Sequence, residues 1–204
     1  MYARSTTITG APGAIDAGID YIRDEVLPTM TALEGCLGMS LVVDRESGRC
    51  IATSAWQTEE AREASLDRLA ANRSRAGEIL GGTPTMDNWE VAAMHRDHTS
   101  PEGSCCRITW GHARDLDTTV DYWRNDRVPA FERMDGFCSA SMLIDRAGSR
   151  TCGTVTFDSR AALEASRAEA ASMREAAGRA VGVEFLDVAE FDLAIAHLRL
   201  PELV

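Results

Sequence analysis

The sequence contains no lysine, so all 21 of its Lys and Arg residues are arginines. Without a primary amine on a side chain, Schiff-base chemistry with pyridoxal phosphate or a carbonyl substrate is excluded, as is a phosphate-loop lysine. Cations are also outnumbered, and the formal net charge is -11. This balance argues against nucleic-acid binding, which needs clustered cations, and against docking on anionic lipid.

Long apolar runs are missing as well. No window reaches the eighteen or so apolar residues that span a bilayer, and residues 1–7 lack the apolar core of a signal peptide. We therefore expect a cytoplasmic protein with no membrane partner. None of the six cysteines forms a C-x-x-C pair, and the adjacent Cys105 and Cys106 have poor geometry for sharing one zinc ion. Reduced, mostly buried thiols and no metal site are expected.

The chain is an internal duplication. When the sequence is shifted by 101 positions, fifteen of the fifty-one residues between Ile15 and Ser65 are identical to those between Leu116 and Ser166. Average composition would give roughly three identities. With one added residue the register is restored at residues 89–95 and 191–197. Two copies are too few for a solenoid, so the duplication predicts a fused dimer.

Each repeat has the pattern of a βαββαβ unit. In the first repeat, strands are expected near residues 2–9, 38–44, 49–57 and 86–95. A helix is expected over about 15–33, with a kink or the start of a new turn at Pro28 and an end at Gly35. Thr58 should cap a second helix, as Ser159 should in the second repeat. We expect repeats at 1–95 and 105–204, joined by a linker at 96–104.

A βαββαβ unit forms a four-stranded antiparallel sheet with both helices on one face. The other face is uncovered, and two copies cover it by packing sheet to sheet. The predicted fold class is therefore α+β, with two tandem ferredoxin-like repeats. We expect a monomer with pseudo-twofold symmetry, or a further homodimer of such chains.

The repeats resemble a known family. The runs Asp24-Glu25-Val26-Leu27-Pro28, Leu41-Val42-Val43-Asp44-Arg45 and Thr53-Ser54-Ala55-Trp56, with Gly35 and Glu63-Ala64-Ser65, are similar to those of the dimeric α+β barrel proteins. More narrowly, they resemble the antibiotic-biosynthesis-monooxygenase-like branch in tandem form. The resemblance implies a ligand cavity between sheet and helices in each half. Family members include cofactor-free oxygenases of aromatic polyketides, proteins that bind or degrade haem, and proteins of unknown activity.

The haem-degrading members carry a Trp and a His on the second helix. Here the corresponding stretches, residues 59–77 and 160–178, contain neither residue type. The resemblance transfers no catalytic residue to this chain, because the residue set of the oxygenase members cannot be mapped onto it position by position. No cofactor is predicted.

Residues that differ between the repeats are the better functional candidates, since one copy can keep a site while the other becomes scaffold. The matched His95 and His197 are therefore interpreted as framework residues. The second repeat has an aromatic and histidine cluster that the first mostly lacks. Its predicted ligand-binding residues are Trp110, His112, Tyr122 and Trp123, with His112 as the catalytic candidate. Flat apolar walls with few polar groups suit a planar ligand, although the aromatic side chains would also serve to fill a core.

Three functions remain open at this stage. The first is a cofactor-independent monooxygenase-like enzyme for a planar apolar substrate. The second is a non-enzymatic binder of a small apolar or aromatic molecule, haem included. The third is a structural or interaction protein with closed cavities. We expect an open cavity in the second half of the chain and a smaller or filled one in the first.

Overall fold

The structure is a computed structural model that describes residues 1–198 and 200–203. The chain divides into two compact units, each assembled from segments that are distant in sequence. The first unit comprises residues 1–89 and 193–200, and the second comprises residues 90–192 and 201–204. Each unit is α+β with ferredoxin-like strand and helix order, so the predicted fold class is confirmed.

The first unit is built around a central antiparallel strand. Strand β3 pairs with β1 on one side and β2 on the other, and Ala52 in β3 lies between Thr6 and Leu41. The order of hydrogen-bonded neighbours is β4, β1, β3, β2, β8. The elements of this repeat are β1 (Tyr2–Thr9), α1 (Ile15–Tyr21), α2 (Leu27–Thr31), β2 (Cys36–Asp44), β3 (Arg49–Trp56), α3 (Glu59–Arg68), α4 (Ala70–Leu80) and β4 (Thr85–Arg96).

The second unit repeats this arrangement. Strand β7 is central and pairs with β5 and β6, and the order of neighbours is β8, β5, β7, β6, β4. Its elements are β5 (Cys105–His112), α5 (Leu116–Tyr122), α6 (Val128–Phe131), β6 (Phe137–Asp145), β7 (Arg150–Phe157), α7 (Arg160–Ala165), α8 (Arg167–Val181) and β8 (Glu184–Leu198).

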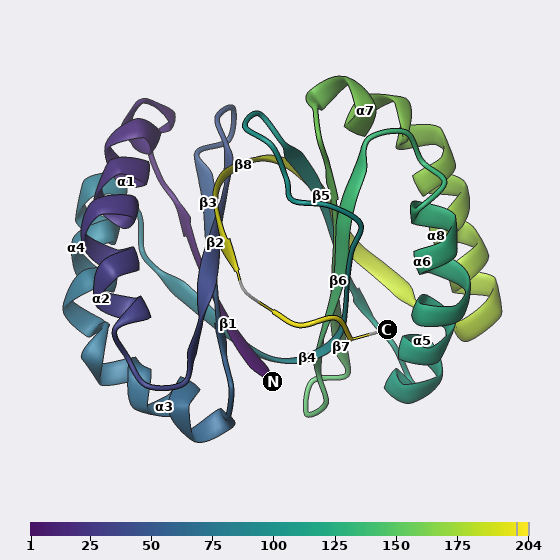
Figure 1. The fold of residues 1–204 in the computed structure, drawn as a ribbon, viewed down its shortest axis with the longest axis horizontal. Helices are drawn as coiled ribbons and strands as arrows, with labels where there is room; N and C mark the ends of the chain where they lie inside the picture. Colours follow the sequence, from purple (N-terminus) through teal and green to yellow (C-terminus); the bar gives the residue numbers. More distant parts are fainter. Residues whose placement is uncertain (199, 204) are drawn as a thin grey trace. The chain divides into compact units, whose positions relative to one another are not determined.

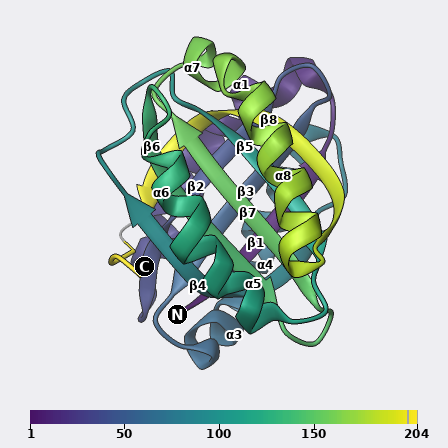
Figure 2. The same ribbon diagram turned by 90° about the vertical axis from the view of Figure 1, so that its right-hand side faces the viewer.

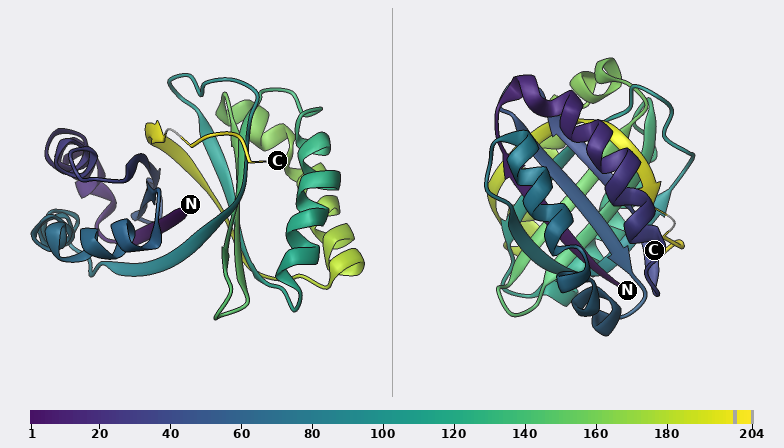
Figure 3. Two further views of the ribbon diagram at one scale, coloured as in Figure 1. Left: turned by 60° about the horizontal axis from the view of Figure 1, so that its bottom comes forward. Right: turned by 90° about the vertical axis from the view of Figure 1, so that its left-hand side faces the viewer.

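Both helical segments of a unit cover the same face of its sheet. In the first unit, α1 and α2 lie beside α4 over strands β1 to β3 (Figure 1 and the right-hand view of Figure 3). In the second unit, α5, α6 and α8 lie over β5 to β7 (Figure 2). Each unit has its own apolar core between helices and sheet, with Trp56 fully buried in the first and Phe157 fully buried in the second.

The compact units do not coincide with the contiguous segments 1–95 and 105–204. The last strand of each repeat is long and belongs to both units. Strand β4 pairs with β6 from Glu90 to Arg96, inside the second unit. Strand β8 pairs with β5 up to Asp192, and from Leu193 onward it belongs to the first unit.

The helix caps follow the sequence. The Thr58 hydroxyl accepts a hydrogen bond from the Ala61 amide at 3.2 Å, and the Ser159 hydroxyl accepts one from Ala162 at 3.2 Å. Both predicted caps are confirmed. Gly35 has a φ of +77°, in the left-handed region where glycine is favoured, and it separates α2 from β2. Within the described residues, no helix has the length and apolarity needed to cross a membrane.

Candidate functional site

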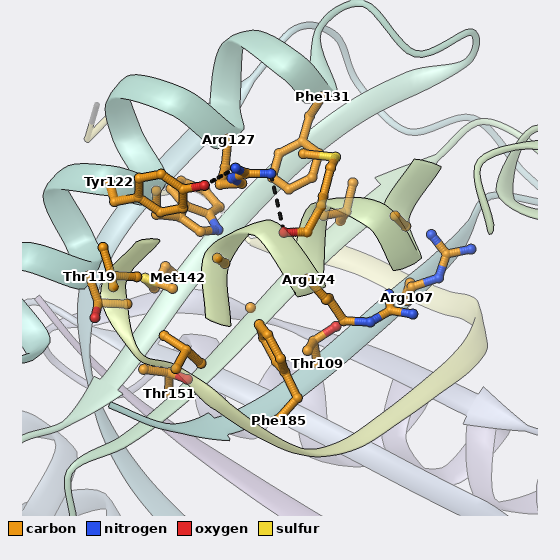
Figure 4. A pocket seen from close by; sticks show the side chains of 18 of the residues that line it. Arg107, Thr109, Thr119, Tyr122, Arg127, Phe131, Met142, Thr151, Arg174 and Phe185 are labelled. Atoms are coloured by element: carbon orange, nitrogen blue, oxygen red, sulfur yellow. Dashed lines mark hydrogen bonds between the residues drawn. The ribbon is translucent and has the colours of Figure 1, made fainter. Parts of the chain in front are cut away.

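The second unit contains a cavity of about 100 Å³ between its sheet and its helices. We call it the second-unit cavity. Its floor includes Thr109 and Met142, and its helical wall carries Arg127 and Arg174 (Figure 4). Gly153 of the sheet and Trp123 of the helical segment also line it. A cavity needs a volume of roughly 10–15 Å³ by the same measure to hold one water molecule. The second-unit cavity therefore has room for a small organic molecule.

The floor is one row of residues across three strands. Thr109 in β5 pairs with Gly153 in β7, and Gly153 pairs with Met142 in β6. Directly opposed residues point to the same face of a sheet, so these three face the helices together. A Cβ atom at Gly153 would lie 3.9 Å from Nε1 of Trp123, which places the indole directly above this glycine.

The helical wall has two parts. Helix α8 contributes Ala170, Met173, Arg174, Ala177 and Val181, whose spacing puts them on one helical face. The other part is the segment from α5 to α6, and it is not a regular α-helix.

A π-helical turn connects α5 to α6. It spans Trp123–Arg127, and the Val128 amide donates to the Trp123 carbonyl, five residues back. The cause lies in Pro129, which lacks an N–H and clashes with the carbonyl four residues earlier, so that a wider turn is favoured. The first repeat has the same turn at Ile22–Val26, before Pro28. The kink predicted at Pro28 is therefore present as a widened turn.

Arg127 is the central polar residue of the second-unit cavity. Its Nη2 donates to the Tyr122 hydroxyl, its Nη1 donates to the Met173 carbonyl at 3.3 Å, and its guanidinium lies 4.6 Å from the centre of the Tyr122 ring (Figure 4). Its Nε is buried without a hydrogen-bond partner in the described part of the chain. The result is a cation and a hydroxyl, side by side, on the helical wall of the cavity.

Arg107 also lines this cavity, but its guanidinium is part of the framework. It is buried and donates to the Ser166 hydroxyl, the Leu163 carbonyl and the Glu190 carboxylate at 2.8–2.9 Å. Burial opposes the ionisation of Glu190, but hydrogen bonds from Arg167 and Arg107 outweigh it and hold the pKa of this carboxyl below its usual range. Arg4 is the corresponding residue in the first unit.

The structure brings together two of the four residues predicted to bind a ligand. Tyr122 and Trp123 both line the second-unit cavity. Trp110 does not, and its ring meets Phe191 edge-on with centroids 6.4 Å apart. His112 is exposed at the end of β5, with Nδ1 3.3 Å from the Ser149 carbonyl.

Side-chain alternation explains this separation. In β5, Arg107 and Thr109 face the helices and the cavity, so Trp110 and His112, at even positions, are not on that face. Alternation defines two faces of a strand but does not tell which of them the helices cover. A catalytic role for His112 would have to lie outside the second-unit cavity.

Among the residues that the sequence analysis does not single out are two cations of the cavity, Arg127 and Arg174. The signal for Arg127 was present, because the shift of 101 positions aligns it with Val26, an apolar residue. A search for differences between the repeats that included charged residues would have found it. Arg174 aligns with Arg73, so no difference between the repeats marks it.

A related cavity of about 70 Å³ lies in the first unit. Three of its lining residues occupy positions equivalent to Trp123, Arg127 and Phe131 of the second unit. They are Ile22, Val26 and Met30, in that order. The predicted order of sizes, with the second cavity the larger, agrees with the two volumes.

Comparison with known proteins places the chain among relatives. The uncharacterized proteins Rv2557 and Rv2558 of Mycobacterium tuberculosis H37Rv are 49% and 48% identical to it. Both alignments cover 100% of this chain, with 92% of Rv2557 and 88% of Rv2558. The family profile described as antibiotic biosynthesis monooxygenase matches residues 1–74. The crystal structure of an anthrone oxidase-like protein is similar at a TM-score of 0.65 and 16% identity, over 94% of this chain and 90% of that one.

Proposed function

Because this chain belongs to one family with Rv2557 and Rv2558 and has the fold of the antibiotic-biosynthesis-monooxygenase-like proteins, we propose that it is a small-molecule oxygenase. Its substrate is a planar, largely apolar molecule that binds in the second-unit cavity. The reaction uses O₂ and no resident cofactor.

The observation that carries this proposal is the composition of the cavity walls. Trp123, Phe131 and Phe185 provide flat apolar surfaces, and Met142 and Met173 add thioether side chains to the same lining. Aromatic walls favour planar ligands, and thioethers adapt to irregular shapes. Only a few polar groups are present to orient the ligand, as in most small-molecule sites.

The chemistry suits a substrate that ionises to an oxyanion. An anthrone is one such compound, since loss of a proton gives an aromatic phenolate. The phenolate donates electrons to O₂. Overall, a CH₂ group becomes C=O, one oxygen atom enters the product, and the other leaves as water. The Arg127 guanidinium and the Tyr122 hydroxyl would stabilise the oxyanion through charge-assisted hydrogen bonds.

A second candidate function is ligand binding without catalysis. One specific observation favours it: of the described residues that line the second-unit cavity, none is a carboxylate, an imidazole or a thiol. Tyr122 is therefore the best candidate for a general base among these lining residues. A substrate that ionises readily in water removes the need for a strong base, whereas a weakly acidic one would bind without turnover.

The test is oxygen uptake against a panel of anthrones and hydroquinones, combined with calorimetric binding of each compound. The proposal expects uptake above the uncatalysed rate for at least one compound, reduced tenfold or more in Trp123→Ile. Ile22 occupies this position in the first unit, so the substitution is one that the fold accommodates.

Phe157→Leu shortens another aromatic side chain that lines the cavity. It provides a comparison in which the volume changes and the indole does not. Binding without uptake would establish the non-catalytic function. If no compound either binds or is oxidised, a small-molecule role for this cavity is rejected.

A further inference from the structure

The second-unit cavity carries an excess of positive charge. Three arginines line it, and no aspartate or glutamate does so among the described residues. Arg107 is neutralised by Glu190, with a donor–acceptor distance of 2.8 Å. The remaining two, Arg127 and Arg174, form no ion pair with any described residue. In a chain of net charge -11, two unpaired cations in one apolar cavity require an explanation.

Arg127, which lines the cavity, retains unused hydrogen-bonding capacity. A guanidinium has five N–H donors, and this one uses two of them, toward Tyr122 and Met173. Its Nε–H is buried and unpartnered. A buried donor without an acceptor is costly, so a ligand acceptor at this position would be favoured.

Arg174, on helix α8, is a second arginine of the cavity wall without an ion pair among the described residues. It is half-buried and forms no hydrogen bond within the described residues. Burial lowers the pKa of Arg174 and the nearby Arg107 lowers it further, against the opposing effect of Glu190. An anion in the cavity would relieve both unfavourable influences.

The first unit shows the related cavity without the charge that Arg127 carries. Val26 stands at the position of Arg127. Arg73 stands at the position of Arg174, but its Nη2 donates to the Leu66 carbonyl at 2.5 Å and its donors are therefore partly used. The Tyr21 hydroxyl, equivalent to that of Tyr122, accepts from Asn72 at 3.4 Å instead of from an arginine.

We infer that the ligand of the second-unit cavity is an aromatic anion whose charge is on oxygen, with a carboxylate as the simplest case. Its charged oxygen pairs with Arg127, and Arg174 adds a second positive charge to the same cavity. This inference rests on the proposed function and narrows its substrate class. Arginine suits the task because its planar donors match the geometry of a carboxylate.

The experiment uses two probes with the same ring system, 2-naphthoate and 2-naphthamide, which differ in charge. Binding of each to the full chain is measured by isothermal titration calorimetry at pH 7. The wild-type chain is expected to bind 2-naphthoate at least tenfold more tightly than 2-naphthamide. In Arg127→Val this preference should fall severalfold, because the affinity for 2-naphthoate drops while that for 2-naphthamide stays the same; the charge of Arg174 accounts for any preference that remains.

Arg127→Val installs the residue that the first repeat carries, and Arg127→Gln is a second variant that keeps a polar side chain but removes the positive charge. Thermal unfolding confirms that each is folded. Equal affinities of the wild-type chain for the two probes overturn the inference and leave the proposed function standing. If 2-naphthamide binds and an undiminished preference for 2-naphthoate persists in both variants, Arg127 is not the anion site and the inference also fails. Absence of binding by both probes overturns the proposed function together with the inference.

Discussion

At the scale of single residues, the sequence identified part of the candidate site. Tyr122 and Trp123 were found because the second repeat carries an added aromatic at position 123, where the first has Ile22. Arg127 differs from its counterpart Val26 in charge and not in aromatic character, so an aromatic and histidine pattern does not include it. Trp110 and His112 were grouped with the cavity because a strand pattern does not show which face the helices cover.

The cysteines permit a prediction at this scale. Burial raises the pKa of Cys50 to about 11 and that of Cys138 to about 11, from an ordinary value of 9.0. Between pH 9 and 11, therefore, these thiols stay protonated in the folded chain and ionise in the unfolded chain. The free energy of unfolding should be unaffected by them below pH 9 and should decrease as pH rises from about 9 toward 11. Urea unfolding at several pH values measures this decrease.

The control is the double variant Cys50→Ala/Cys138→Ala, in which the decrease over that pH range should be smaller. The same burial predicts that a thiol reagent at pH 8 reacts slowly with Cys50 and Cys138 in the native chain and rapidly after unfolding. Fast modification of either residue in the native chain would contradict the burial that raises its pKa.

At the scale of elements, local sequence signals were sufficient for most boundaries. The strands expected at 2–9 and 86–95 correspond to β1 (Tyr2–Thr9) and β4 (Thr85–Arg96). The break at Pro28 was also expected, but its form as a π-turn was not. A proline indicates that one regular hydrogen bond of the helix is lost. It does not indicate whether the helix bends there or forms a wider turn. That difference determines which residues face the cavity.

The paired helix caps give a prediction at this scale. Replacing Thr58 or Ser159 with Ala removes the acceptor for one amide at the start of α3 or α7. Each substitution should lower the free energy of unfolding by about 1 kcal/mol, the usual cost of losing a hydroxyl cap. Thr58→Ser and Ser159→Thr keep the hydroxyl and should remain close to the wild type in urea unfolding. A loss as large in these conservative variants would assign the effect to packing.

At the scale of the whole molecule, the duplication predicted the fold class but not the two compact units. A repeat of 101 residues implied two similar βαββαβ units, and the structure contains them. The sharing of β4 and β8 was not predicted, because alternation indicates that a segment is a strand without naming its hydrogen-bond partner. The long β8 (Glu184–Leu198) therefore changes unit at Leu193, with no signal in its sequence.

The difference between the repeats leads to a prediction about stoichiometry. Both units have a cavity, and among the described lining residues only those of the second combine an indole with a free arginine donor. The wild-type chain should therefore bind one 2-naphthoate, and calorimetry should give a stoichiometry near one. The double variant Ile22→Trp/Val26→Arg transfers the two side chains to the first unit, beside Tyr21. Its stoichiometry should rise toward two, provided that the indole and the guanidinium are the features that make the second-unit cavity a binding site.

The single variant Val26→Arg separates the two contributions. In this variant the added guanidinium lies next to Tyr21, but the cavity has no indole. The first-unit cavity is also smaller, about 70 Å³ before substitution. Binding of a second 2-naphthoate should therefore be weak. A wild-type stoichiometry of two would mean that the conserved elements of both repeats, including the arginines Arg73 and Arg174, are enough for binding. The residues that differ between the repeats would then determine only how tightly each cavity binds 2-naphthoate, and both repeats would have kept a ligand-binding site.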